Sequence, residues 1–215
     1  MLYLKKILDF LFPIRCVGCK IENFWICPKC LGKIHIARSH QENWIISVFD
    51  YRNVDLRKLL WHFKFKRKWS VIDNMADTLY DHLIDEISER NLFENITKPL
   101  LIPIPMTKRS IRKRGYNQAA IVAKKLYEKS QNFLEINMTS LKKFLETEDQ
   151  NKIKNREARF ENIKNAFMVN SNGHVRGRNI ILVDDIVTTG ATLMEAKKVL
   201  LQAGAESVLA FTVAH

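Results

Sequence analysis

The clearest chemistry in the sequence lies near its end, where small residues follow an apolar run. Residues 180–183 (IILV) are typical of a buried parallel strand. Thr and Gly residues that lead into a helix offer hydroxyls, free amides and the positive end of the helix dipole, which suit a phosphate. We call these residues the phosphate loop: Thr188, Thr189, Gly190, Ala191 and Thr192.

Two acidic residues, Asp184 and Asp185, stand between this strand and the phosphate loop, and we call them the acidic pair. Carboxylates repel a phosphate, but they accept hydrogen bonds from sugar hydroxyls or hold a divalent metal ion. The loop and the pair together predict a site for a ribose 5-phosphate, with the pair as its catalytic candidates. The alternative is a buried strand that ends in a solvated acidic turn.

The four cysteines of the chain form two C-x-x-C pairs: Cys16 and Cys19, then Cys27 and Cys30. Four thiolates at this spacing can surround one zinc ion at about 2.3 Å, as a closed structural site without catalysis. Two disulfides or free thiols are the alternative, and a reducing compartment argues against disulfides. The spacing predicts a small zinc module that folds only with its ion.

The chain has 215 residues and a net charge of +12, which indicates a polyanionic partner: nucleic acid, a phosphorylated ligand or anionic lipid. Residues 56–70 are basic and rich in aromatic residues, a combination that single-stranded nucleic-acid grooves use for backbone and bases. We expect most of these rings to lie in the core, because aromatic side chains usually do. The predicted nucleic-acid surface comprises Lys64, Lys66, Arg67 and Lys68.

The remaining pattern predicts an α/β protein. Residues 44–51 and 207–213 are expected to be strands, and residues 54–65, 71–90 and 193–203 helices. No apolar run is long enough to span a membrane. Residues 1–12 predict a short amphipathic helix, docked on the protein or lying on an anionic membrane surface. We find no export signal, so we expect a cytoplasmic protein, either free or peripheral at the inner face of the membrane.

Several of these segments resemble one known family. IILVDDIVTTGAT at residues 180–192 is similar to the phosphoribosyl-pyrophosphate (PRPP) binding motif of type I phosphoribosyltransferases. LIPIPM at 101–106, RKRGYNQ at 112–118, residues 141–150 and RFENIKNAF at 159–167 resemble segments of the competence protein ComF family, which includes the GntX-type proteins. The paired cysteines also match this family, and the ordered set covers nearly the whole chain.

The resemblance implies a type I phosphoribosyltransferase fold, a mostly parallel sheet flanked by helices, at residues 44–215. A four-cysteine zinc module and the N-terminal helix would occupy residues 1–43. The acidic pair would hold the ribose hydroxyls of PRPP, and the phosphate loop its 5-phosphate. Pyrophosphate with Mg²⁺ would lie at a proline turn followed by a mobile basic loop; the residues are Pro103, Pro105, Lys108, Arg109, Arg112 and Arg114.

The resemblance further implies a cytoplasmic protein required for DNA uptake in natural transformation. Such a protein would bind PRPP or a nucleotide 5′-phosphate together with single-stranded DNA, and would meet a DNA-translocating helicase or an inner-membrane uptake channel. Two alternatives stay open. One is an active phosphoribosyltransferase of nucleotide metabolism, and the other is a zinc-dependent interaction module that recruits a DNA-translocation motor.

Overall fold

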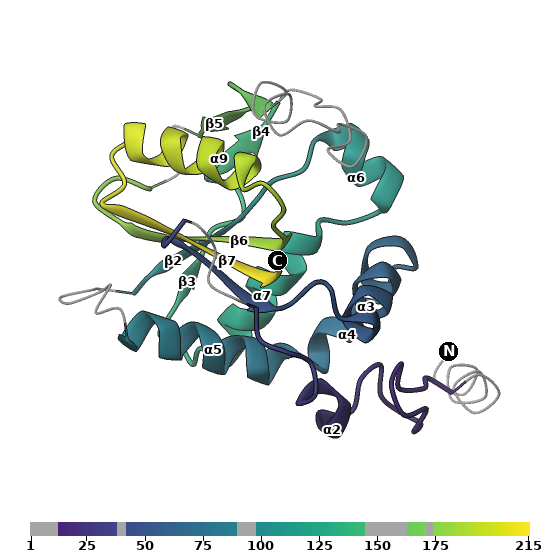
Figure 1. Cartoon of the computed structure of the whole chain (residues 1–215). Helices are drawn as coiled ribbons and strands as arrows, with labels where there is room; N and C mark the ends of the chain where they lie inside the picture. The colour runs from purple at the N-terminus through teal and green to yellow at the C-terminus, as the bar shows by residue number, and fades with distance from the viewer. Residues whose placement is uncertain (1–12, 38–41, 90–97, 145–162, 171–173) are drawn as a thin grey trace.

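The computed structural model describes residues 13–37, 42–89, 98–144, 163–170 and 174–215, and it is built on one parallel sheet (Figure 1). The helix predicted over residues 1–12 lies outside the described residues. Five parallel strands follow the order β1-β7-β6-β2-β3. Their bounds are β1 Ile45–Phe49, β7 Ser207–Ala214, β6 Asn179–Ile186, β2 Leu100–Pro103 and β3 Glu135–Ile136.

Helices cover both faces of this sheet, which explains why its strands are apolar without alternation (Figure 1). One face is covered by α9 (Ala191–Gln202); the other is covered by α3 (Val54–Phe65), α5 (Ala76–Glu89) and α7 (Gln118–Lys129). Strand β6 serves both cores, because Ile181 and Val183 pack with α3, α5 and α7 while Ile180 and Leu182 pack with α9.

Most elements match the predicted ones. Helix α3 begins after Asn53, whose side chain accepts hydrogen bonds from the N–H groups of Asp55 and Leu56. The single helix predicted over residues 71–90 is wrong in one respect, because it is two helices, α4 (Ser70–Asp73) and α5. They separate at Asn74, whose side chain accepts the Trp25 N–H at 2.9 Å.

The cysteine-containing segment packs against α3 and α4, with a short helix α2 (Pro28–Leu31). Its buried side chains, including Cys16, Ile26 and Leu31, belong to the same hydrophobic cluster as α3 and one face of the sheet. Trp25 also donates its indole N–H to the Ser70 hydroxyl at 2.8 Å. The division of the chain into residues 1–43 and 44–215 stays a prediction.

Two further elements lie beside the main sheet. Strands β4 (Leu141–Lys143) and β5 (Phe167–Val169) form a separate antiparallel pair on the α9 side (Figure 1). Helix α6 (Lys108–Arg114) projects beyond the carboxyl ends of the strands (Figure 1). Within the described parts of the chain, no helix has the length and apolarity that crossing a membrane requires.

Candidate functional site

Strand β6 delivers the acidic pair to the carboxyl edge of the sheet. The strand runs past the acids, since Asp184 pairs with Thr212 and Ile186 with Ala214 of β7. The acids therefore belong to the ordered end of a strand, and the alternative of a solvated acidic turn is wrong for Asp185, which is only 6% exposed. Its Oδ1 accepts the Ile186 N–H at 2.7 Å, while Asp184 Oδ1 accepts the Asp185 N–H.

The phosphate loop follows directly and turns into α9. Gly190 is the N-cap of α9 and has a φ of 75°, a left-handed conformation that glycine adopts without strain. Gly190 has no side chain to cap the helix, and among the described residues the Ala191 N–H makes a long contact to Thr189 Oγ1, at 3.5 Å. Helix N-terminal amides without a cap are donors for an anion. A small cavity of about 50 Å³ is lined by Asp184, Ile186 and four residues of the loop, namely Thr188, Gly190, Ala191 and Thr192.

The electrostatics of the acidic pair differ from those of exposed carboxylates. Burial, and then the repulsion of the neighbouring Asp185, raise the pKa of Asp184 to about 7. The charges of Lys64 and Lys143 oppose this rise. Lys64 Nζ lies 3.0 Å from Asp185 Oδ2, so one acid of the pair already has a counter-charge.

The predicted proline turn comes to the same edge. Strand β2 pairs with β6 so that Pro103 lies opposite Val183, and the Ile104 N–H donates to the Val183 carbonyl at 2.9 Å. Asn117, the N-cap of α7, accepts the Ala120 N–H and donates from Nδ2 to the Ile104 carbonyl. The turn of Pro103 and Pro105, which we call the anion turn, is thus held beside the acidic pair.

The basic segment after this turn is helix α6, so the expectation of a loop there is wrong. Thr107 caps the helix by accepting the Ser110 N–H, and Gly115 ends it with a φ of 90°. These two capping signals were present in the sequence and explain why seven residues rich in charge form a helix. The predicted cations of this segment all lie on α6: Lys108, Arg109, Arg112 and Arg114.

Two buried polar side chains on either side of the Asn117 cap were not singled out as ligand-binding residues. The Tyr116 hydroxyl and Gln118 Nε2 are buried and have no hydrogen-bond partner among the described residues. Burial is the main reason that the pKa of Tyr116 rises to about 12. Their place in the RKRGYNQ segment was the only sequence signal for them, because neither residue type by itself predicts a site.

The predicted nucleic-acid surface divides into two parts. Three rings expected in the core are instead exposed: Trp61 (47%), Phe65 (60%) and Trp69 (53%), whereas Phe63 is buried as expected. Lys66 Nζ lies 5.1 Å from the Trp61 ring centre, and Lys68 Nζ 6.0 Å from that of Trp25. We call Trp61, Phe65, Lys66, Arg67, Lys68 and Trp69 the aromatic–basic surface; Lys64 points away from it, to Asp185.

The four cysteines converge. Their sulfur atoms all lie within 4.8 Å of one another, and Cys19 Sγ and Cys27 Sγ are 3.6 Å apart. Four Zn–S bonds of about 2.3 Å require sulfur–sulfur distances of about 3.8 Å in a tetrahedron, so the cluster fits a zinc ion. Burial opposes ionisation of Cys16, but the N–H groups of Cys19 and Cys27 donate to its sulfur and lower its pKa to about 6.

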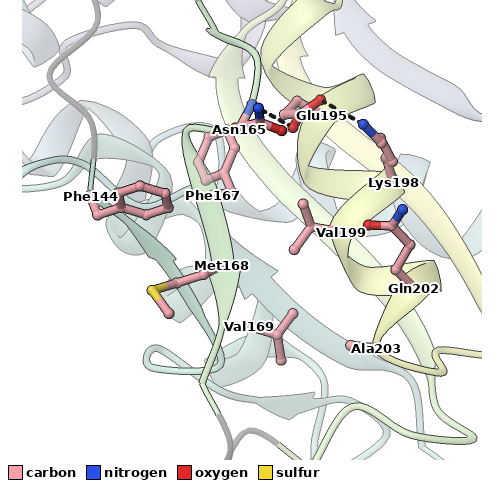
Figure 2. A pocket seen from close by; sticks show the side chains of 10 residues that line it. All are labelled: Phe144, Asn165, Phe167, Met168, Val169, Glu195, Lys198, Val199, Gln202 and Ala203. Atoms are coloured by element: carbon pink, nitrogen blue, oxygen red, sulfur yellow. Dashed lines mark hydrogen bonds and ion pairs between the residues drawn. The ribbon is translucent and has the colours of Figure 1, made fainter.

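A wider cavity lies between β5 and α9 and offers different chemistry (Figure 2). Its volume is about 580 Å³, and apolar side chains such as Phe144, Met168 and Val199 form much of its wall. Glu195 in this wall already accepts the Asn165 N–H at 2.8 Å. This cavity does not combine hydroxyls, helix amides and paired acids, so it does not fit a sugar phosphate.

Comparisons with known proteins identify a domain family for most of the chain. The phosphoribosyl transferase domain family matches residues 77–215. Competence protein F of Haemophilus influenzae is 28% identical, over 93% of this chain and 90% of its own length. Competence protein ComFC of Bacillus subtilis is 32% identical, over 78% of this chain and 62% of its own length. A hypoxanthine phosphoribosyltransferase structure from Trypanosoma cruzi aligns over 67% of this chain and 64% of its own, with 13% identity and a TM-score of 0.39.

The parallel sheet, the acidic pair and the phosphate loop together define a type I phosphoribosyltransferase fold with a cysteine cluster at its N-terminal side that could bind zinc. The chain belongs to the phosphoribosyl transferase domain family, and its similarity to competence proteins F and ComFC supports the predicted competence protein ComF family. The predicted family and fold class are therefore confirmed.

The cysteine cluster gives the first prediction. Purified protein is expected to contain one zinc ion per chain, and Cys19→Ser combined with Cys27→Ser to contain none, as measured by atomic emission. Because such a module folds with its ion, residues 13–37 of this variant lose protection in hydrogen exchange. His35→Ala is the control, since it removes a nearby potential ligand outside the cluster and retains the metal. Full protection of residues 13–37 without zinc would contradict the prediction.

The acidic pair gives the second prediction. Folding raises the pKa of Asp184 from 3.8 to about 7, so the native protein binds this proton more tightly than the unfolded chain. The free energy of unfolding therefore falls as pH rises from about 4 to about 7. Asp184→Asn removes this contribution and flattens the fall. Urea unfolding at about pH 5 and about pH 7.5, without divalent cations, measures this change in the free energy of unfolding. The same pH dependence in the variant as in the wild type would contradict the prediction.

Proposed function

We propose that this protein handles incoming DNA in natural transformation, with a ribose 5-phosphate group bound at the phosphate loop and single-stranded DNA on the aromatic–basic surface. The observation that carries the proposal is the meeting of three features at one sheet edge: the phosphate loop, the acidic pair and the anion turn. The names of the similar competence proteins support the link to DNA uptake.

Each part of the site has a separate task in binding PRPP. The amides of α9 and the hydroxyls of the phosphate loop take the 5-phosphate, since the loop lies at an uncapped helix N-terminus. The acidic pair accepts hydrogen bonds from the ribose hydroxyls. The anion turn and the cations of α6 face the pyrophosphate, which brings Mg²⁺ with it. A transferase reaction would in addition need an acceptor nucleophile and would release pyrophosphate.

The aromatic–basic surface suits a single strand of DNA. Cations interleaved with exposed rings give charge for the phosphates and flat faces for the bases. Helix α3 places Trp61 and Phe65 one turn apart, with ring centres 6.4 Å from each other. Lys66, Arg67 and Lys68 continue the same segment, and all three are exposed. We propose that a helicase or an inner-membrane channel delivers the strand to this surface on the cytoplasmic side.

The third prediction tests the sugar-phosphate site. Wild-type protein is expected to bind PRPP with Mg²⁺ in calorimetry, and Asp184→Asn with Asp185→Asn to bind it at least about tenfold more weakly, because charged hydrogen-bond acceptors are lost. Asp81→Asn, an exposed acid on α5, is the matched control and keeps wild-type affinity. Pyrophosphate release in the same samples with nucleobases present would identify an active transferase.

The same double variant is also tested in cells. If the site serves DNA uptake, transformation frequency falls with the double variant and not with Asp81→Asn. Wild-type transformation with the double variant would contradict the role of the site and favour the interaction module.

The fourth prediction concerns the DNA surface. Trp61→Ala with Trp69→Ala is expected to weaken binding of a single-stranded oligonucleotide in fluorescence anisotropy, by about 1–3 kcal/mol for each lost base–ring stack. Lys66→Ala is expected to make the plot of log K against log salt concentration less steep, by about 0.7 in its slope for each phosphate contact that is removed. Phe133→Ala, an exposed aromatic before β3, is the control. Equal affinity of the tryptophan variant and the wild type would argue against stacking at this surface.

A further inference from the structure

One cation of the basic stretch, Lys64, points toward the carboxyl edge of the sheet instead of toward solvent. Lys64 Nζ lies 3.0 Å from Asp185 Oδ2, and the two side chains are only 20% and 9% exposed. The other lysine–carboxylate pairs of the described residues are more exposed; Lys58 with Asp55 on the same helix, for example, is 54% and 38% exposed. The Lys64–Asp185 ion pair is therefore more shielded from solvent than these other pairs.

The position of Lys64 on α3 explains its direction. Helical spacing puts Trp61 and Phe65 on the exposed side of α3, while Leu60 and Phe63 are buried against the sheet. Lys64 stands between these faces, so its long side chain can reach along the buried side to the end of β6. Its neighbours in sequence, Lys66 to Lys68, remain exposed.

The contact completes the hydrogen bonding of one buried carboxylate. Asp185 Oδ1 accepts the N–H of Ile186, and Oδ2 faces the ammonium group of Lys64. Both oxygens are thus engaged, which fixes the rotamer of Asp185 beside Asp184. Two adjacent carboxylates repel each other, and a buried carboxylate without a partner is strongly disfavoured. Lys64 supplies the counter-charge that lets the pair exist at this place.

We propose that Lys64 is a positioning residue of the sugar-phosphate site, which acts through Asp185 by fixing its carboxylate beside Asp184, the acid that lines the loop cavity. This inference rests on the proposed function, because it assigns a role within that site. It also removes Lys64 from the nucleic-acid surface, which is then made of the aromatic–basic surface alone. Lys64 is a residue of α3, so the helix that carries two rings of the proposed DNA surface, Trp61 and Phe65, also supports the sugar-phosphate site.

The fifth prediction tests Lys64 with PRPP and Mg²⁺ in calorimetry on the full chain. Lys64→Met keeps most of the side chain and removes the charge, and it is expected to weaken PRPP binding at least about tenfold. Lys64→Arg restores the affinity to within about threefold, because it returns the cation to Asp185. Lys58→Met, which breaks the exposed pair on the same helix, keeps wild-type affinity. A thermal unfolding curve is measured for each variant, and calorimetry is carried out at a temperature at which all of them are folded.

A double-mutant cycle separates positioning from direct contact with the ligand. In an Asp185→Asn background, Lys64→Met is expected to change PRPP affinity by less than about twofold, because the carboxylate through which it acts is gone. A full tenfold loss in that background would mean that Lys64 binds the ligand itself, and it overturns the proposal. Wild-type affinity of Lys64→Met also overturns it. Wild-type protein that does not bind PRPP overturns the proposed function as a whole, which is a different result.

Discussion

Strand β6 is hydrogen-bonded on both sides, to β7 and to β2, and this double parallel pairing fixes every other part of the candidate site. The pairing with β2 brings the anion turn to the end of β6. The pairing with β7 continues through the acidic pair, so the backbone keeps its strand geometry as far as Ile186. Parallel strands end at the same edge, so residues from distant segments meet there. The phosphate loop then needs only Gly190 to turn the chain into α9.

Helix α3 connects three parts of the molecule that the sequence presents as separate motifs. Its buried side contacts the sheet and carries Lys64 to Asp185. Its exposed side carries Trp61 and Phe65, two of the three rings of the proposed DNA surface. His62 lies between them, with its ring 5.2 Å from that of Trp25 in the cysteine segment. The cysteine segment therefore packs against the last turn of α3.

Several features could be predicted because they depend on residues close together in the chain. The bounds of α3, the apolar character of β6 and the cap at Asn117 follow from periodicity and side-chain type. The same local rules would have given α6, whose Thr107 and Gly115 signals were outweighed by its charge. Trp61, Phe65 and Trp69 are exposed although aromatic side chains are usually buried. This could not be predicted, because a segment of alternating rings and cations does not indicate which of its sides packs against the core.

The sequence by itself determined the family, through an ordered set of segments along nearly the whole chain. It also determined the cysteine spacing and the residues of the phosphate loop, because each of these is a short motif whose chemistry lies in its own residue types. Only the tertiary structure decided that Lys64 pairs with Asp185, that the Tyr116 and Gln118 side chains are buried at the start of α7, and that three rings face outward. These facts depend on which strands are neighbours and on how α3 is rotated against the sheet. Packing of distant segments sets both, and no local pattern of residues encodes either of them.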